Sequence, residues 1–148
     1  MDDTSLAVAF RFDTNMKTKN IIYWAARLLS AAIMLQTLYF KFSASPESVY
    51  IFTTVGMEPW GRIGVGVMEL IASGLILFTS TAWLGAGLAL GLMVGAIGMH
   101  FTILGIVVQN DGGQLFLYAV IVTVCSLYIL WYNSDKIELL VQRFRPQK

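Results

Sequence analysis

The sequence predicts an all-α membrane protein whose four transmembrane helices pack as an antiparallel bundle. Two observations lead to this fold class. Hydrophobic residues make up 57% of the 148 residues and charged residues only 13%, whereas soluble domains carry about 25% charged residues. The apolar residues are also gathered into four long runs, each close to the roughly 20 residues that a helix needs to cross a bilayer. Composition and clustering together are typical of a polytopic membrane protein.

The four apolar runs are expected to be helices, because backbone in lipid must satisfy its own hydrogen bonds and a helix does so within one segment. The spans are expected at about residues 21–40, 61–78, 83–108 and 114–132. The link TSTA joins the second span to the third, and QNDGG joins the third to the fourth. Links this short make consecutive helices antiparallel neighbours. Residues 20–133 are therefore expected to form one membrane domain.

The link of residues 41–60 is longer and carries a helix-start pattern of its own. Its SPES tetrapeptide places Ser45 at the N-cap and Pro46 at the first helical position. Gly56 is expected to end this short helix. Lys41 and Arg62 flank the link and are expected to be cations at the membrane edge.

Basic residues flank both ends of the predicted membrane domain, in a polar segment of residues 1–19 and in a tail of residues 134–148. These residues are Arg11, Lys17, Lys19, Lys136, Arg143, Arg145 and Lys148. An even number of spans places both flanks on one side of the membrane, and the Lys and Arg residues mark that side as cytoplasmic. We therefore expect a multi-pass protein of the bacterial inner membrane, with both termini in the cytoplasm and the 41–60 link outside.

Gly87, Gly91 and Gly95 recur every four residues along the third span. Such a ridge of small residues lets two helices approach closely within a membrane. Packing inside the bundle is the expected use of this glycine ridge, and the seam of a homodimer is the alternative.

Three ionisable residues lie within the predicted spans: Arg27 in the first, Glu69 in the second and His100 in the third. A charge at mid-bilayer costs roughly 2.5–3.5 kcal/mol on insertion scales, so such side chains usually face the bundle interior and find partners. At about 1.5 Å of rise per residue, Glu69 and His100 lie at similar depth, and Arg27 starts nearer the cytoplasm. The sequence therefore predicts a buried polar cluster in which Arg27 holds Glu69, with His100 nearby.

This cluster allows two interpretations. It is either a buried Arg27–Glu69 ion pair that fixes the register of the helices, or a polar pocket that handles protons or binds an anion or a quinone. His100 also allows two interpretations. It is either an interior histidine whose hydrogen bonds are all made within the protein, or a residue that binds a ligand or carries a proton.

The counts of chemically active residues exclude several kinds of site. The chain has one cysteine, Cys125, and one histidine, His100. An intrachain disulfide, a Cys-x-x-Cys dithiol and a bis-histidine haem site within one chain are therefore impossible. No metal site is expected, since a zinc site of thiolates and imidazoles would lack ligands. The net charge of +1 offers no basic face for nucleic acid. Redox chemistry would need a bound quinone, a flavin or a partner protein, and no motif in the chain attaches a cofactor.

Four features, one in each of the first three spans and one in the first link, follow one another along the chain in a characteristic order and spacing. The first span carries ARLLSA with Arg27 and closes at YFKF with Lys41, and the following link ends in VGMEPW. The second span holds Glu69 within GVMELIASGLIL, and the third leads through GLMVGAIGMH to His100. In these features the chain resembles the DoxX and DoxX-like family of small four-helix membrane proteins. The resemblance covers about residues 20–132, so it implies the same four-helix fold.

The resemblance also implies a function. The family is named after a subunit associated with a thiosulfate:quinone oxidoreductase, and other members are linked to membrane-bound oxidative-stress complexes. By position, Arg27, Glu69 and His100 match the family's polar membrane residues, and Lys41 matches its closing lysine. The leading hypothesis is a subunit of a redox or oxidative-stress assembly, with a quinone or another small molecule near Glu69. The chain has no self-contained catalytic motif, so it would be at most an oxidoreductase-associated subunit.

Two other functions stay open. One is a non-catalytic membrane scaffold or assembly factor, in which the Arg27–Glu69 pair is structural and the glycine ridge is sensitive to substitution. The other is a small proton-coupled carrier. This function is less suitable, because four spans without an inverted repeat are few for a transporter. The expected partners are the lipid bilayer, redox-enzyme subunits and, as an alternative, a second copy of this chain.

Overall fold

The computed structural model describes residues 3–144, with side chains described for residues 16–140, 142 and 143. Every regular element in this range is a helix. Four segments are long and apolar enough to cross a membrane, namely Met16–Phe42, Trp60–Leu77, Ala82–Leu104 and Gln114–Tyr132. The prediction of an all-α bundle with four transmembrane helices is confirmed.

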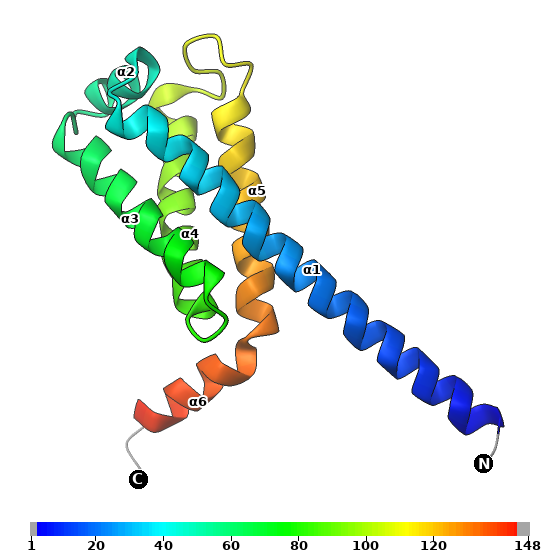
Figure 1. Ribbon diagram of the computed structural model, residues 1–148. Helices are drawn as coiled ribbons and strands as arrows, with labels where there is room; N and C mark the ends of the chain where they lie inside the picture. The colour runs from blue at the N-terminus through cyan, green and yellow to red at the C-terminus, as the bar shows by residue number, and fades with distance from the viewer. Residues whose placement is uncertain (1–2, 145–148) are drawn as a thin grey trace.

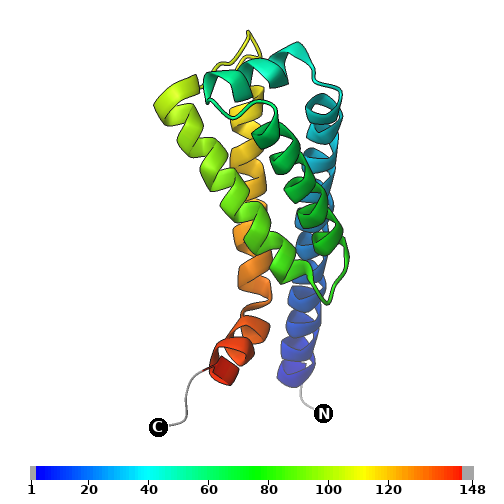
Figure 2. The same ribbon diagram turned by 90° about the vertical axis from the view of Figure 1, so that its left-hand side faces the viewer.

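The four long helices stand side by side (Figures 1 and 2). They are α1 (Asp3–Phe42), α3 (Trp60–Leu77), α4 (Ala82–Met99) and α5 (Gln114–Tyr132). Both α1 and α4 pack against α3 and α5, so the order around the bundle is α1, α3, α4, α5. The start of α1 and the final helix α6 (Ser134–Phe144) lie at the same end of the bundle, as an even number of spans requires.

The first helix is longer than the span predicted at residues 21–40. It begins at Asp3, so the predicted polar segment of residues 1–19 continues the membrane helix from its third residue onward. This part of α1 projects beyond the other three long helices (Figure 1). The side chain of Arg11 lies outside the described part of the chain.

The predicted basic tail begins as helix α6, which turns away from the axis of α5 (Figure 1). Lys136 Nζ donates a hydrogen bond to the carbonyl oxygen of Thr79 at 3.2 Å, in the turn between α3 and α4. This contact ties the tail to the end of the bundle. Arg145 and Lys148, which the sequence includes in the same basic tail, lie outside the described residues.

The short helix predicted in the 41–60 link is confirmed as α2 (Pro46–Thr54). The Ser45 hydroxyl accepts a hydrogen bond from the backbone N–H of Ser48 at 3.3 Å, which satisfies one of the unpaired donors of the first turn. Gly56 follows the helix with a φ of +78°, a conformation that favours glycine. α2 contacts α1, α3 and the turn of residues His100–Leu104 that follows α4, and it lies across the end of the bundle away from α6 (Figure 2). We call this end the α2 end.

The third span ends earlier than predicted. α4 gives way to one turn of π-helix, η1 (His100–Leu104), and the chain leaves the helix at Gly105 with a φ of +77°. The prediction that this span reaches Val108 is wrong, because the backbone N–H of Val108 is held by the Asp111 carboxylate at 2.8 Å instead of by a helical carbonyl. Single turns of π-helix occur frequently at functional sites, and this one carries His100.

Large apolar side chains cover the outside of the bundle, and its centre combines alanines with larger side chains such as Ile76 and Ile129. Ala72, Ala86 and Ala89 are completely buried. The exposed large apolar side chains come from all four long helices and include Leu28, Leu70, Ile71, Leu84, Val94, Phe101, Leu117, Val124 and Trp131. Soluble monomers rarely expose apolar surface of this extent. Together with the four spans, this surface identifies a multi-pass protein that lies in a lipid bilayer.

The glycine ridge does not pack inside the bundle, which corrects the prediction for Gly87, Gly91 and Gly95. A Cβ atom added at any of the three would meet no described atom within 4 Å. The close approach of α3 and α4 occurs at Gly85 instead, where an added Cβ would lie 2.6 Å from the backbone nitrogen of Ile76. α4 is therefore rotated so that Gly85 faces α3 and the ridge faces away from it. The homodimer seam stays a prediction.

Gly85→Ala is expected to destabilise the bundle by about 1–3 kcal/mol, because the new methyl group overlaps the backbone of α3. The matched control is Gly87→Ala, which adds the same methyl group to the same helix in open space. It is expected to be neutral or to stabilise by up to about 1 kcal/mol, since alanine is the better helix former. Thermal unfolding in detergent, followed by circular dichroism, measures both. Equal effects of the two substitutions would contradict the observed rotation of α4.

Candidate functional site

Arg27 does not reach Glu69, which corrects the predicted pair. Its buried side chain donates hydrogen bonds to the C-terminal end of α3, from Nε to the carbonyl of Ile76 at 2.8 Å and from Nη2 to the carbonyl of Leu77 at 2.7 Å. The guanidinium carbon also lies 4.0 Å from a ring centroid of Trp24. The last carbonyls of a helix lack intrahelical donors, and α3 has no basic residue in its own last turn. Arg27 supplies those donors, so it caps α3.

Glu69 is paired with Lys41. The distance from Lys41 Nζ to Glu69 Oε2 is 2.9 Å. The Thr37 hydroxyl shares its one proton between the same carboxylate oxygen at 3.1 Å and the carbonyl oxygen of Met34 at 2.9 Å. The side chains of Lys41 and Glu69 are only 14% and 5% exposed. Thr37 and Lys41 are four residues apart and therefore lie on one face of α1. The carboxylate thus has the counter-ion and the hydrogen-bond donor that a buried charge requires.

Lys41 lies at the end of the first candidate membrane span, Met16–Phe42, as predicted, but its ammonium points into the bundle and pairs with Glu69. The end of α1 packs beside the second turn of α3, where a Cβ added to Gly66 would lie 3.7 Å from Lys41 Cβ. Gly66 is three residues from Glu69, which is about one helical turn. The long side chain of Lys41 covers this distance of one turn and reaches Glu69.

Arg62, the other predicted edge cation, is also held within the protein. Its Nη2 lies 2.7 Å from Glu58 Oε1 and its Nε 2.9 Å from Glu58 Oε2, while Nη1 donates to the carbonyl oxygen of Lys41. These contacts tie the end of α1 to the start of α3. Arg62 therefore fixes the backbone that carries Lys41.

His100 opens η1 at the α2 end of the bundle. Its Nδ1 lies 2.7 Å from the carbonyl oxygen of Gly105. Its ring packs edge-to-face against Phe116 of α5, with 5.5 Å between ring centroids. The residue is 6% exposed. A hydrogen bond and an aromatic contact therefore hold the imidazole in one orientation.

The loop of residues 105–113 is organised by Asp111. Its carboxylate accepts hydrogen bonds from the backbone N–H groups of Val108 at 2.8 Å, Gly113 at 2.9 Å and Leu115 at 3.1 Å. Partial desolvation acts to raise the pKa of Asp111, but these three donors and the nearby His100 outweigh it and hold that pKa below its ordinary value. The carboxylate therefore stays ionised and keeps the loop closed over the start of α5.

Because the folded pKa of Asp111 is lowered, its stabilising effect is complete above the ordinary aspartate pKa of about 3.9 and is lost as the pH falls through the folded value. Asp111→Asn removes the charge and keeps the shape of the side chain. It is expected to cost about 1 kcal/mol near neutral pH, as the loss of a helix cap does, and nothing in strong acid. Thermal unfolding at both pH values measures the difference. Asp135→Asn, on exposed α6, is the control, and an equal loss at both pH values would contradict this account.

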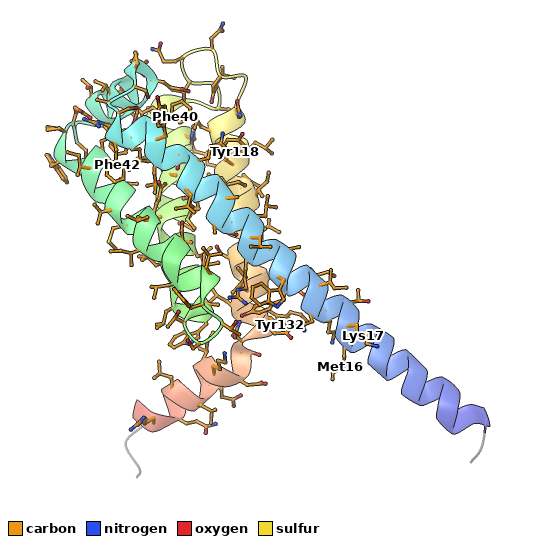
Figure 3. All side chains as sticks on the ribbon, viewed as in Figure 1. Met16, Lys17, Phe40, Phe42, Tyr118 and Tyr132 are labelled. Carbon is orange, nitrogen blue, oxygen red and sulfur yellow. The ribbon has the colours of Figure 1, made fainter. Side chains whose placement is uncertain are left out.

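A cavity of about 370 Å³ lies at the α2 end, lined by residues of all four long helices, of α2 and of η1. Its volume falls within the range of about 300–1,000 Å³ that small-molecule pockets occupy. Phe40 of α1 and Tyr118 of α5, both lining residues, lie at this end in Figure 3. α2 contributes Ile51 and Phe52 to the lining. A helix from the link therefore forms part of the wall of an otherwise interhelical cavity.

Glu69, Lys41 and His100 all line this cavity, and Arg27 does not. The cavity thus sets a few polar groups within an apolar wall, which is the usual composition of a ligand site. Lys41 offers hydrogen-bond donors, Glu69 offers acceptors, and His100 can exchange a proton. Among the described side chains, no group of three His, Cys, Asp or Glu residues could hold a metal ion. The arrangement is suited to a small amphipathic molecule.

Reasoning from the sequence misses three parts of this site: Lys41 as the partner of Glu69, Asp111 as the organiser of the loop, and α2 as a wall. Two signals could have found the first. The four-residue spacing of Thr37 and Lys41 points two polar side chains to one helix face. The end of α3 also lacks a basic residue, which indicates that Arg27 is needed there and leaves Glu69 to another cation.

Comparison with models of protein families, with curated proteins and with solved structures gives no match to this chain. Function is therefore argued from the cavity and from the motifs quoted above.

Proposed function

We propose that this chain is a ligand-binding subunit of a redox or oxidative-stress assembly in the bacterial inner membrane, and that a quinone binds in the cavity beside Glu69. One observation carries the proposal. A cavity of about 370 Å³ is lined by a buried Lys41–Glu69 pair and by His100, within apolar walls and between helices that cross the membrane. With both termini in the cytoplasm, the α2 end would face the outside.

The residues of the cavity fit a quinone. A quinone has an apolar ring and tail and two carbonyl oxygens that only accept hydrogen bonds. The ammonium of Lys41 carries three N–H donors and is held in place by Glu69 at 2.9 Å. At least one of these donors is left for a carbonyl oxygen, while apolar lining residues such as Met34 and Met93 would contact the ring.

A bound quinone would supply two-electron redox chemistry that the side chains lack. The chain has a single cysteine and a single histidine, so the electrons would have to pass to or from a partner subunit. The four DoxX-like features support the same role, because that family is named after an oxidoreductase-associated subunit. In this proposal the chain binds and orients the quinone, and the partner carries the catalytic groups.

The test is purification in mild detergent, followed by mass spectrometry of the small molecules and proteins that copurify. Wild type is compared with Glu69→Gln, and the matched control is Glu138→Gln, the same change on exposed α6. Prenyl quinone is expected with the wild type and the control. Its molar ratio to protein is expected to fall about tenfold in Glu69→Gln, because Lys41 loses the carboxylate that positions its ammonium. Circular dichroism confirms that the variant is folded.

A wild type that brings no quinone and takes up none when a short-tailed quinone is added would contradict the proposal. If the wild type and Glu69→Gln then brought the same partner proteins, the alternative of a non-catalytic scaffold would be favoured. One observation supports that alternative: the glycine ridge of Gly87, Gly91 and Gly95 is exposed on α4, where a partner helix could approach closely. Gly91 and Gly95 also line the cavity.

A further inference from the structure

The tautomer of His100 follows from its hydrogen bond to Gly105. Nδ1 lies 2.7 Å from a carbonyl oxygen, and a carbonyl oxygen can only accept, so Nδ1 carries the proton. In the uncharged ring the other nitrogen, Nε2, is then a hydrogen-bond acceptor. Gly105 has a φ of +77°, which favours glycine. The backbone that fixes this tautomer is therefore specified by the sequence.

The acceptor nitrogen is left for an occupant of the cavity. His100 lines the cavity, and its described hydrogen bond uses Nδ1 only. No described protein group donates to Nε2. The edge-to-face contact with Phe116 at 5.5 Å between centroids restrains rotation of the ring, so Nε2 cannot exchange places with Nδ1 without breaking both contacts.

The charged groups around the cavity also favour a ligand that donates hydrogen bonds. The lining includes three carboxylates, Glu47, Glu69 and Asp111, and one ammonium, that of Lys41. With His100 uncharged, the lining carries a net negative charge. An anionic ligand would be repelled, whereas a neutral hydroxyl group would find several acceptors.

We propose that the cavity binds the reduced form, a hydroquinone, more tightly than the oxidised quinone or an anionic amphiphile, a proposal that rests on the proposed quinone site. The hydroxyl group of the hydroquinone donates a hydrogen bond to Nε2 of His100. Lys41 can donate to an oxygen of either redox form, so both forms bind. Only the hydroquinone has an O–H group for the acceptor that Gly105 fixes on His100. The oxidised ring would set a carbonyl oxygen against the lone pair of Nε2.

The test compares three probes by isothermal titration calorimetry on the purified full chain in detergent without oxygen. They are a short-tailed benzoquinone, the same molecule reduced chemically to its hydroquinone, and a carboxylic acid with the same tail. The buffer is set at about pH 8, where an ordinary histidine is uncharged. The hydroquinone is expected to bind about tenfold more tightly than the quinone, as one additional buried hydrogen bond gives, and the acid is expected to bind most weakly.

His100→Phe removes the acceptor and keeps an aromatic ring, so it is expected to make the two redox forms bind equally. Phe101→Leu is the control, because Phe101 is on the same π-turn but exposed and outside the cavity lining. Quinone binding equal to or tighter than hydroquinone binding in the wild type would overturn this inference and leave the quinone site standing. Binding of neither form would overturn both.

A second measurement needs no variant. His100 is the only histidine in the chain, so a ¹⁵N-histidine NMR spectrum of protein purified without a histidine tag reports this residue alone. A protonated Nδ1 and an unprotonated Nε2 are expected, and the Nε2 signal is expected to move when hydroquinone is added. Protonation of Nε2 in the uncharged ring, or an Nε2 signal that hydroquinone leaves unchanged, would overturn the inference even if His100→Phe did not fold.

Discussion

Replacing Lys41 by methionine is expected to destabilise the bundle by about 3 kcal/mol, because Glu69 would keep a buried carboxylate without its cation. The two side chains are 14% and 5% exposed and lie 2.9 Å apart, so little solvent is available to replace the lost ammonium. The Thr37 hydroxyl would remain as a donor at 3.1 Å, but one neutral hydrogen bond does not offset a charge. Reversible unfolding of the detergent-solubilised chain measures the loss.

The double variant Lys41→Met with Glu69→Leu is expected to recover most of that stability, since an apolar pair of similar size often replaces a buried ion pair without loss. Lys136→Met, which removes only the exposed hydrogen bond to Thr79, is the control and is expected to cost less than about 1 kcal/mol. If the double variant is as unstable as Lys41→Met, the loss comes from packing of the lysine stem and not from the unpaired carboxylate.

The same double variant separates folding from function. It is expected to be folded and to bind no quinone, because it lacks the Lys41 ammonium that would donate to the quinone and the Glu69 carboxylate that positions it. A folded double variant that still copurifies with quinone would show that the charged pair serves stability only.

Replacing Arg27 by alanine is expected to cost about 3–5 kcal/mol, through the loss of several hydrogen bonds from a charged donor and the cavity left in the core. The carbonyls of Ile76 and Leu77 at the end of α3 would lose donors that now lie at 2.8 and 2.7 Å. Arg27→Lys is expected to recover only part of this loss, because a lysine lacks the planar fork that reaches two carbonyls at once. Thermal unfolding in detergent measures both variants.

Arg27 lies outside the cavity, so the amount of quinone per folded molecule is expected to stay unchanged in Arg27→Lys. Arg143→Ala on α6, where the side chain is exposed, is the control for loss of a basic residue. Loss of quinone from a folded Arg27→Lys protein would contradict the separation of the α3 cap from the ligand site. It would return Arg27 to the cluster that the sequence predicts.

The elements of the fold follow closely from local sequence. The span predicted at residues 114–132 matches α5 (Gln114–Tyr132), because an apolar run bounded by Gly113 and Asn133 has unambiguous ends. The SPES pattern predicts α2 correctly because an N-cap depends only on neighbouring residues. The predicted end of the third span is wrong, because Val107 and Val108 are as apolar as the residues of the helix before them and give no signal that the helix has ended. Only the π-turn at His100 and the hydrogen bonds of Asp111 end that helix.

The candidate site follows from the sequence only in part. Glu69 and His100 can be predicted as site residues because ionisable side chains are rare in apolar spans. Both line the cavity. The prediction that Arg27 pairs with Glu69 is wrong. The depth of each residue is calculated along its own helix, as if all helices were parallel and ended at the same level. The end of α1 instead lies beside Gly66 of α3, which brings Lys41 within reach. The same calculation places Arg27 toward the end of the bundle that carries α6, where the last carbonyls of α3 need hydrogen-bond donors.

The sequence by itself determines that this protein crosses a membrane, how many times it does so, and where most of its helices begin and end. These properties depend on hydrophobicity and caps, which are local to each segment. Only the tertiary structure decides that Lys41 holds Glu69, that Arg27 caps α3, and that the glycine ridge lies open. These contacts depend on the tilt and rotation of whole helices. In a membrane the lipid is as apolar as the core, so the apolar pattern of a helix does not show which face turns inward.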